Sequence, residues 1–379
     1  GDHRDLHSFP TRRSSDLVHL WPGAHAESEQ SIASWLRDVA REPTRTRARS
    51  QATSGPAPKT FVECTSLQFR YVAQVIVVFG TVCLDKVRRV PELPQKGGYV
   101  EIESETSYLG GEAANTAVML ARWRADVVLA GNSIGAGPEA AFLRNSVLAA
   151  ELSADGVPMG AAAPPECDIY VTPDGERTMI GKGFSRLAAS EEHGVVPLRM
   201  GGWFTADPNL GQVARQAARA AAAEGMNVYL MDFIQPQDFD SPFDVWQSST
   251  DWCGRRGDDE ANRAFLRERF EGKGKLAIVT DGDRKVHVLF PGGEERDFDV
   301  YRCGPVVDST GAGDAFRAGM LHGLDQSWRF GKCLAFASAA GCLQCRSEGA
   351  TQSVPSVDEV ERLMEAQAEV TRQFLEGAP

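Results

Sequence analysis

The sequence predicts an α/β fold: a doubly wound, mostly parallel sheet with helices on both faces, and a small β-strand lid. Three observations support this prediction. Apolar runs rich in β-branched residues alternate with segments of helical spacing, which is the pattern of a parallel sheet covered by helices. These runs end at glycine or polar turn residues, as strands buried on both faces do. Two other segments have the turn signals or alternating pattern of solvated strands.

The first apolar run, residues 72–80, has the sequence VAQVIVVFG and ends at Gly80, so it predicts a buried strand. The alanine-rich stretch 214–225 has helical spacing and stops at Gly225. The same patterns predict, in chain order, a helix over 116–123, a strand and turn over 125–135, a helix over 140–152, strands over 226–234, 275–282 and 286–290, and a helix over 330–345.

Two segments interrupt the alternation of strands and helices. Residues 99–108 alternate apolar and polar side chains, and residues 166–183 carry Pro-Asp-Gly between two strand-like runs, which is a strong hairpin signal. We expect lid segments at about 86–109 and 166–184, which would exclude water from a reaction. Because exposed edge strands invite pairing, a homodimer through the lid strands is also an expectation.

The N-terminal part differs in composition from the rest. Residues 7–17, HSFPTRRSSDL, resemble the in-frame translation of a common sequencing adapter, and the stretch up to about Lys59 is rich in Arg, Ser, Pro and Ala. A transit peptide is the alternative explanation. We interpret residues 1–70 as a non-native or disordered extension, residues 71–366 as one domain and residues 367–379 as a C-terminal tail.

Composition excludes several classes of protein. A formal net charge of −12 argues against nonspecific nucleic-acid binding, and no apolar run reaches the roughly 18 residues of a membrane span. The eight cysteines are scattered, which favours a reducing cytoplasm over a secreted disulfide framework. Cys342 and Cys345 form a lone C-x-x-C without further metal ligands at usable spacing, so we expect them to pack between helices.

The stretch 306–316, VVDSTGAGDAF, lies between an apolar strand-like run and a helix start. The backbone N–H groups of Gly311, Ala312 and Gly313 would lie at the positive end of that helix, where proteins bind phosphate. A carboxylate repels phosphate, so Asp314 is unexpected there unless it accepts a proton. The stretch therefore predicts a phosphate site with a general base beside it.

Other nucleotide-binding motifs do not fit. A Walker loop needs Gly-Lys followed by Ser or Thr, and every Gly-Lys pair in the chain is followed by a different residue. The sequence GAGPEA from Gly135 matches a loose dinucleotide fingerprint. However, its strand lies deep in the chain, and no acidic residue ends a following strand at the expected distance.

A second glycine motif lies at residues 110–118, GGEAANTAV, where two glycines open a helix and Asn115 lies one turn inside it. Glycines let a ligand approach the backbone closely, and Asn115 could bind a hydroxyl group. By itself the motif is explained equally well by a plain turn followed by a surface asparagine.

Together these motifs resemble the PfkB (ribokinase-like) family of carbohydrate and nucleoside kinases over roughly residues 75–364. VVFGTVCLDKV resembles the first strand of the family, GGEAANTAVMLARW its first signature, and DSTGAGDAFRAG its second. TDG, residues 280–282, resembles the end of the nucleotide-site strand. EGATQSVPS resembles the C-terminal loop that closes the adenine and monovalent-cation sites.

The resemblance implies an ATP-dependent phosphotransferase that uses Mg²⁺ and a potassium-like ion. Asp314 would take the proton of an acceptor hydroxyl as this hydroxyl attacks the γ-phosphate. The other residues implied are the anion-hole amides of Gly311, Ala312 and Gly313, the substrate-binding residues Asp85, Gly110, Gly111 and Asn115, the nucleotide-binding Thr280 and Gly282, and the ion-binding Asp308, Thr310, Gly349 and Ser353.

The nucleotide side departs from the family pattern in two places. The family's Asn-x-x-Glu motif orders metal-bound water and phosphates, and in the equivalent region VWQSSTDWCGRRGD its places are held by Ser248 and Asp251. Asp251 would organise Mg²⁺ through water, but a variable loop without function is an equally good explanation. Lys285 replaces the last glycine of Thr-x-Gly-x-x-Gly, and we favour a solvent-facing lysine over a phosphate contact.

The leading hypothesis is a cytoplasmic carbohydrate kinase that moves the γ-phosphate of ATP to a hydroxyl of a sugar or sugar derivative. A nucleoside kinase is the alternative within the family, and a catalytically weak ligand-binding sensor is the alternative outside it. No nucleic-acid or membrane partner is expected. The sequence does not name the substrate or the phosphorylated hydroxyl, because lid residues that face the site cannot be identified from it.

Overall fold

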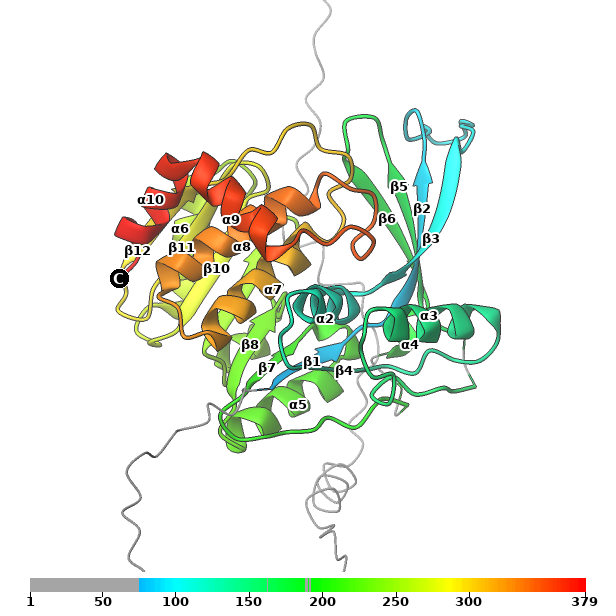
Figure 1. Cartoon of the computed structure of the whole chain (residues 1–379), viewed down its shortest axis with the longest axis horizontal. Coiled ribbons are helices and arrows are strands. Elements are labelled where there is room, and N and C mark those ends of the chain that lie inside the picture. The colour runs from blue at the N-terminus through cyan, green and yellow to red at the C-terminus, as the bar shows by residue number, and fades with distance from the viewer. Residues whose placement is uncertain (1–74, 162, 188–189, 191) are drawn as a thin grey trace, which may run out of the picture. The chain divides into compact units, whose positions relative to one another are not determined.

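The computed structural model of the chain describes residues 75–161, 163–187, 190 and 192–379, so the interpretation of residues 1–70 lies outside the described residues. Two sheets organise this part (Figure 1). The larger has eight strands in the order β12-β11-β10-β9-β8-β7-β1-β4. In chain order these are β1 (Ile76–Gly80), β4 (Val127–Gly131), β7 (Trp203–Ala206), β8 (Asn227–Met231), β9 (Val245–Ser249), β10 (Leu276–Thr280), β11 (Lys285–Leu289) and β12 (Glu295–Asp299).

Most of the large sheet is parallel. Every pairing from β4 through β1, β7, β8 and β9 to β10 is parallel, whereas β11 and β12 add two antiparallel pairings at one edge. A parallel sheet is stable when helices cover both faces, and the strands must then be apolar on both sides. The five residues of β1 are accordingly all buried. The predicted doubly wound, mostly parallel sheet is confirmed.

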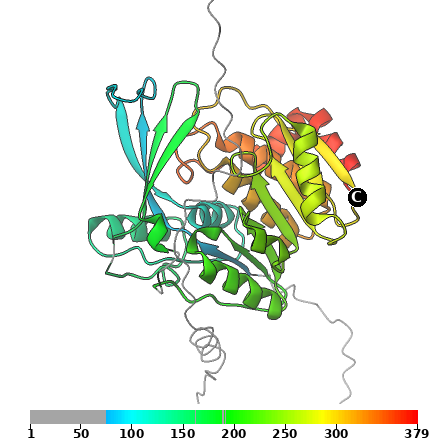
Figure 2. The ribbon, with the colours of Figure 1, turned by 180° about the vertical axis from the view of Figure 1, so that it is seen from behind.

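Helices cover both faces of this sheet. Ile76 and Val78 of β1 pack into one core with α2, α7 and α8, while Val77 and Phe79 pack into a second core with α5 and α6. This alternation follows from the two-residue period of a strand. Figure 2 shows α5 and α6 on the face opposite to that seen in Figure 1. The helices are α2 (Glu112–Arg122), α3 (Pro138–Ala149), α4 (Phe184–Leu187), α5 (Gln212–Ala223), α6 (Asp259–Phe270), α7 (Ala312–Asp325), α8 (Phe330–Gln344), α9 (Val357–Ala366) and α10 (Ala368–Gly377), with short 3₁₀ turns η2 (Pro208–Leu210) and η3 (Pro236–Asp240).

The smaller sheet has the strand order β3-β2-β5-β6 and forms the lid. Its strands are β2 (Cys83–Arg89), β3 (Ser104–Gly110), β5 (Glu166–Val171) and β6 (Arg177–Lys182). Two antiparallel pairings flank a central parallel one, and the buried core of the sheet is small. The chain passes from β1 of the large sheet directly into β2 of the lid, so the lid begins beside the ends of the parallel strands.

Each strand and helix predicted in order from the sequence has a counterpart in the structure. The strands β7, β9 and β12 were not predicted, because β7 has only four residues and because β9 (VWQSS) and β12 (ERDFD) are largely polar. Residues 368–377, placed in a C-terminal tail by the sequence interpretation, form α10, whose Phe374 is fully buried and stacks on Phe298 at 4.6 Å. Cys342 has a role beyond helix packing, because it forms a disulfide with Cys303.

Candidate active site

The loop before α7 places free backbone N–H groups at the positive end of a long helix. Gly311 has φ 79°, a left-handed conformation that favours glycine, and a Cβ there would lie 2.5 Å from the Cβ of Ala350. The Ala312 amide donates to Ser309 O at 3.3 Å. Within the described ranges, the amides of Gly311 and Gly313 have no protein acceptor. These amides therefore remain available for an anion.

Asp314 lies in the first turn of α7, directly behind these amides, and is only 5% exposed. Its Oδ2 accepts a hydrogen bond of 2.8 Å from Asn115 Nδ2 of α2, and its Oδ1 lies 3.3 Å from Arg317 Nη2. Burial raises the pKa of Asp314 to about 6, although Arg317 and Asn115 act in the opposite direction. A carboxyl group with such a pKa is ionised near neutral pH and can accept a proton.

Arg317 is fully buried and joins α7 to α2. Its Nε donates to Thr116 Oγ1 at 2.8 Å, and its Nη2 donates to the backbone oxygen of Glu112 as well as to Asp314. The sequence interpretation quoted Arg317 within the second signature without giving it a role. Its spacing of one helical turn from Asp314 was the signal that could have identified it.

Carboxylates cluster around the same point. Burial raises the pKa of Asp232 to about 7, although a 2.6 Å hydrogen bond from Ser248 lowers it. Burial also raises the pKa of Glu112 well above its usual value. Asp207, Asp232 and Asp314 each add to the shift of Glu112. The Oε2 atom of Glu112 is buried without a hydrogen-bond partner among the described residues. This acidic corner suits a hydrated divalent cation.

Asp85 of β2 is the second predicted residue that the structure buries near Asp314. Burial raises the pKa of Asp85 to about 7, and the charge of Asp314 also raises it, whereas a hydrogen bond from Cys83 lowers it. Gly110 is required here, because a Cβ at that position would lie 2.0 Å from the Asp85 carboxyl carbon. Gly111 has φ 100°, and its Cβ would lie 2.3 Å from Thr81 O. The two glycines thus let the chain at the start of α2, the helix that carries Asn115, lie close to Asp85 and to the Thr81 backbone.

Three of the four predicted ion-binding residues are connected by hydrogen bonds. Asp308 is fully buried, and its carboxylate accepts from the Thr310 amide at 2.9 Å, the Thr310 hydroxyl at 2.6 Å and the Gly349 amide at 2.9 Å. No ion pair to Asp308 occurs in the part of the chain that the structure describes. Ser353 is exposed and takes no part in this network.

The predicted nucleotide-binding residues are less closely connected. Thr280 ends β10, and its hydroxyl donates to Ser248 O at 3.5 Å, while Gly282 forms the turn that follows with φ 55°. The Ser248 hydroxyl is buried and directed to Asp232, whereas the Asp251 side chain is 64% exposed. Ser248 and Asp251 thus contact different partners in this structure, Asp232 and Arg177. Lys285 forms an ion pair with Asp299 at 3.0 Å.

Arg177 of β6 connects the lid to the loop before α7. Its Nη1 donates to Ser309 O at 2.8 Å and to Ser309 Oγ at 2.7 Å, and its Nη2 lies 4.0 Å from Asp251. Its charge also lowers the pKa of both Asp85 and Asp314, as a lesser cause in each case. The sequence placed this residue in the predicted hairpin but gave no indication that it faces the site.

Solved structures of known proteins share the fold of this chain. Ribokinase from Arabidopsis thaliana, solved with ribose and ATP, superposes with a TM-score of 0.62 at 19% identity, covering 77% of this chain and 99% of that chain. A nucleoside kinase from Methanocaldococcus jannaschii superposes with a TM-score of 0.61 at 18% identity, covering 78% and 99%. At these identities the matches establish a ribokinase-like fold.

The sequence profile of the pfkB family of carbohydrate kinases matches residues 73–357, and the chain belongs to that family. A protein described as an uncharacterized sugar kinase from Dictyostelium discoideum is 28% identical over 350 residues, covering 76% of this chain and 97% of the relative. An ATP-dependent ribose-1-phosphate kinase from Halopiger xanaduensis is 28% identical over 290 residues, covering 74% and 95%. Kinases of this family use ATP. In the described ranges, no helix is both long and apolar enough to cross a membrane.

Proposed function

We propose that this protein transfers the γ-phosphate of ATP to a hydroxyl group of a sugar or sugar derivative. The observation that carries the proposal is the position of Asp314. It is a buried carboxylate with a raised pKa, held by Asn115 and Arg317 and placed directly behind the Gly311 and Gly313 amides. A proton acceptor and an anion site adjacent to each other are the two elements that phosphoryl transfer to an alcohol needs.

In this proposal the acceptor hydroxyl lies between Asp85 and Asp314. Asp85 binds neighbouring hydroxyl groups, Asn115 orients the base, and Asp314 takes the proton as the hydroxyl attacks the γ-phosphate. The amides of Gly311, Ala312 and Gly313 stabilise the negative charge that develops on the transferred phosphoryl group. To do so, the Ala312 amide must give up its long hydrogen bond to Ser309 O and donate to the phosphoryl group instead. Thr280 and Gly282 line the nucleotide. Arg177, a lid residue, brings a positive charge to the phosphates.

Glu112 and Asp232 are the carboxylates that would hold Mg²⁺, through water. This assignment rests on the unpartnered Oε2 atom of Glu112 and on the raised pKa of both groups, which ionise more readily beside a cation. The metal supplies charge neutralisation at the phosphates. Ser248 acts here by orienting Asp232, and Asp251 stays at the exposed margin.

Asp308, Thr310 and Gly349 would surround a potassium-like ion. A fully buried carboxylate without an ion-pair partner in the described part of the chain fits a cation. An ion there would stabilise the loop that carries Gly311, since Asp308 and Thr310 belong to that loop. Ser353 joins this site only if the loop that contains it moves inward.

An acceptor panel tests the proposal. The full chain would be incubated with Mg-ATP and K⁺, and ADP release measured with ketoses, aldoses, sugar phosphates and nucleosides, with acceptor omitted as the control for ATP hydrolysis. We expect turnover on one class of sugar or sugar phosphate, reduced when Na⁺ replaces K⁺. Turnover on nucleosides alone would support the alternative family activity. A ligand-induced rise in Tm without turnover on any acceptor would overturn the kinase and support a sensor.

A further inference from the structure

A disulfide connects two segments that the proposed phosphotransfer does not use. Cys303 lies in the loop between β12 and α7, and Cys342 lies in the last turn of α8, with their Cα atoms 6.2 Å apart. The same loop is bound to the same end of α8 by two backbone hydrogen bonds. Val307 N and Asp308 N donate to Cys345 O at 2.8 and 3.4 Å. The loop between β12 and α7 is therefore held to the end of α8 by the disulfide and by these two hydrogen bonds.

Each sulfur atom lies close to a backbone oxygen that can accept a hydrogen bond from the thiol after reduction. Cys303 Sγ is 2.7 Å from Cys342 O, and Cys342 Sγ is 3.3 Å from Tyr301 O. A thiol can donate a hydrogen bond to each of these oxygens, whereas a disulfide cannot. After reduction each thiol therefore has a backbone acceptor, so the surroundings are compatible with the open pair of thiols.

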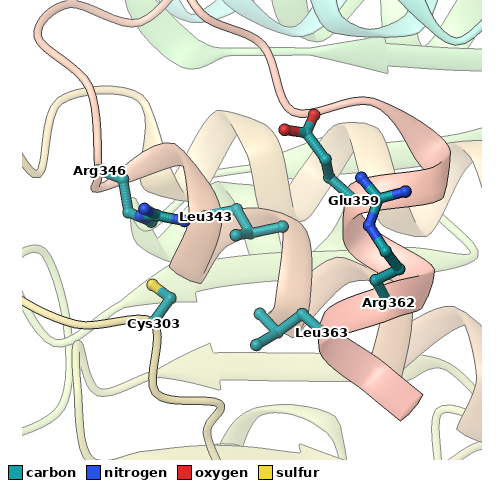
Figure 3. A pocket seen from close by; sticks show the side chains of 6 residues that line it. All are labelled: Cys303, Leu343, Arg346, Glu359, Arg362 and Leu363. Atoms are coloured by element: carbon teal, nitrogen blue, oxygen red, sulfur yellow. The ribbon is translucent and has the colours of Figure 1, made fainter. Parts of the chain in front are cut away.

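A pocket of about 330 Å³ opens beside one of the two sulfur atoms (Figure 3). Cys303 lines this pocket, but Cys342 does not. The remaining lining residues come from the end of α8 and from α9: Leu343, Arg346, Glu359, Arg362 and Leu363. An attacking molecule in the pocket thus meets the Cys303 sulfur first.

The charge of the pocket favours an anionic ligand. Two guanidinium groups, Arg346 and Arg362, share it with one carboxylate, Glu359. That carboxylate already accepts hydrogen bonds from the Ser356 amide at 2.8 Å and the Ser356 hydroxyl at 2.7 Å. These bonds lower the pKa of Glu359, and Arg362 and Arg346 lower it further. Neither arginine has an ion-pair partner within 4.0 Å among the residues described, so both can bind carboxylates of a ligand.

We propose that this pocket is a thiol–disulfide exchange site for a small thiol that carries carboxylate groups. The carboxylates bind Arg346 and Arg362, which places the thiolate sulfur against Cys303. Attack forms a bond between the incoming sulfur and Cys303 Sγ and breaks the bond to Cys342. The electron pair goes to Cys342 Sγ, which takes up a proton from water and, as a thiol, donates a hydrogen bond to Tyr301 O.

The step needs no external oxidant, because one disulfide is exchanged for another. Cys342 can reverse it by attacking Cys303 Sγ and expelling the small thiol. Exchange removes the covalent constraint from the loop that leads to Asp308 and Gly311, while the backbone bonds to Cys345 remain. The proposal does not depend on the proposed kinase activity.

The test compares two thiols on the full chain, purified with the disulfide closed. Glutathione carries two carboxylates, and 2-mercaptoethanol carries none. At equal thiolate concentration we expect glutathione to react about tenfold faster, an advantage that salt reduces. Intact mass would show one added glutathione per chain, and peptide mapping would place it on Cys303. Phosphotransfer is not measured, so the result is separate from that of the acceptor panel.

Two double variants isolate the role of the pocket. Arg346→Gln with Arg362→Gln is expected to remove the preference for glutathione. Arg122→Gln with Arg372→Gln, which removes two exposed arginines outside the pocket, is expected to preserve it. The proposal is overturned by equal rates for the two thiols in the unchanged protein, by an adduct on Cys342, by an unaltered preference in the first double variant, or by finding both cysteines as free thiols after aerobic purification.

Discussion

The candidate site has an acceptor side, formed by the residues proposed to bind the acceptor, and a nucleotide side, formed by those proposed to bind ATP. Without ligand, the side chains of the acceptor side are held more firmly than those of the nucleotide side. On the acceptor side, Asp85, Asn115 and Asp314 are buried, and Asn115 is hydrogen-bonded to the base. On the nucleotide side, Thr280 makes one long hydrogen bond and Asp251 is exposed. Preorganised groups act strongly in a transition state, whereas exposed ones contribute mainly to binding. Substitutions should therefore cost more on the acceptor side.

The largest effect is expected for Asp314→Asn. The amide preserves the shape of the side chain but cannot accept the proton, so kcat should fall about 10³-fold with little change in KM for ATP. Asp325→Asn, at the opposite end of α7, is the control and should leave kcat unchanged. Steady-state kinetics on the best acceptor measures both. A fall of less than tenfold in Asp314→Asn would remove the general base from the proposal.

Gly110→Ala should have the next largest effect. Its Cβ would lie 2.0 Å from the Asp85 carboxyl carbon, so the carboxylate must move, and we expect kcat/KM for the acceptor to fall about 10²-fold. The KM for ATP should change less, because the displaced group lies on the acceptor side. Gly292→Ala is the matched control, since a Cβ there meets no atom within 4 Å. Equal effects on the two substrates would contradict the division into two sides.

The pH dependence tests the burial of the same carboxylates. Asp314 must be ionised to act as base, and its raised pKa of about 6 predicts that kcat/KM falls tenfold per pH unit below that value. An exposed aspartate would place this fall near pH 4. Asp314 is faced by Arg317 on its own helix, by Glu112 on α2, by Asp85 and Arg177 of the lid, and by Asp207 and Asp232 after their strands. The pH profile therefore reports the titration of these coupled residues together and not of Asp314 alone. A flat profile between pH 5 and 8 would contradict the raised pKa that burial gives Asp314.

The same shifts predict the direction of a change in stability. The folded-state pKa values of Asp85 and Asp232, both about 7, lie above the usual value of 3.8. Their protonated forms therefore add stability that is fully present below about pH 4 and is lost as pH rises through 7. Thermal unfolding of the full chain should show a lower Tm at pH 8 than at pH 5. Asp232→Asn should reduce this difference.

The smallest effects are expected on the nucleotide side. Ser248→Ala removes the hydrogen bond to Asp232 and should lower the free energy of unfolding by about 1–3 kcal/mol, because a buried carboxylate loses its donor. Asp251→Ala should change the KM for ATP at most about threefold, since its contact with Arg177 is long and exposed. Denaturant unfolding and ATP titration measure these. A hundredfold loss in Asp251→Ala would give Asp251 the role that the sequence pattern assigned to it.

The residues assigned to the acceptor side belong to contiguous motifs, so the sequence could place them in one site. Asp314 and the glycines before it are recognisable as a helix start, and the structure places Asn115 one turn into α2 as expected. The apolar pair Val306 and Val307, expected in a strand, lies exposed in the loop between β12 and α7. Arg177 was not identified, because the side of a lid strand that faces the site depends on its register and on how the lid packs. Ser248 and Asp251 were paired by spacing alone, and spacing does not show that one is buried in β9 and the other is exposed.

The cysteine pair shows the same limit. A sequence gives the separation of Cys303 and Cys342 along the chain but not their distance in space, which depends on the packing of the β12–α7 loop against α8. The fold itself was predictable from the alternation of apolar runs and helical segments. Short strands such as β7 escaped prediction because four residues provide too little pattern.

Side-chain hydrogen bonds hold the passage from β1 into β2 in place. Thr81 is fixed by hydrogen bonds of 2.8 Å from its amide and from its hydroxyl to Asp207, and Val82 exchanges bonds of 2.8 and 3.0 Å with Asn132. Asp85 follows these bonds closely along β2. Its backbone is therefore anchored, through its own strand, to residues that follow strands β7 and β4 of the large sheet.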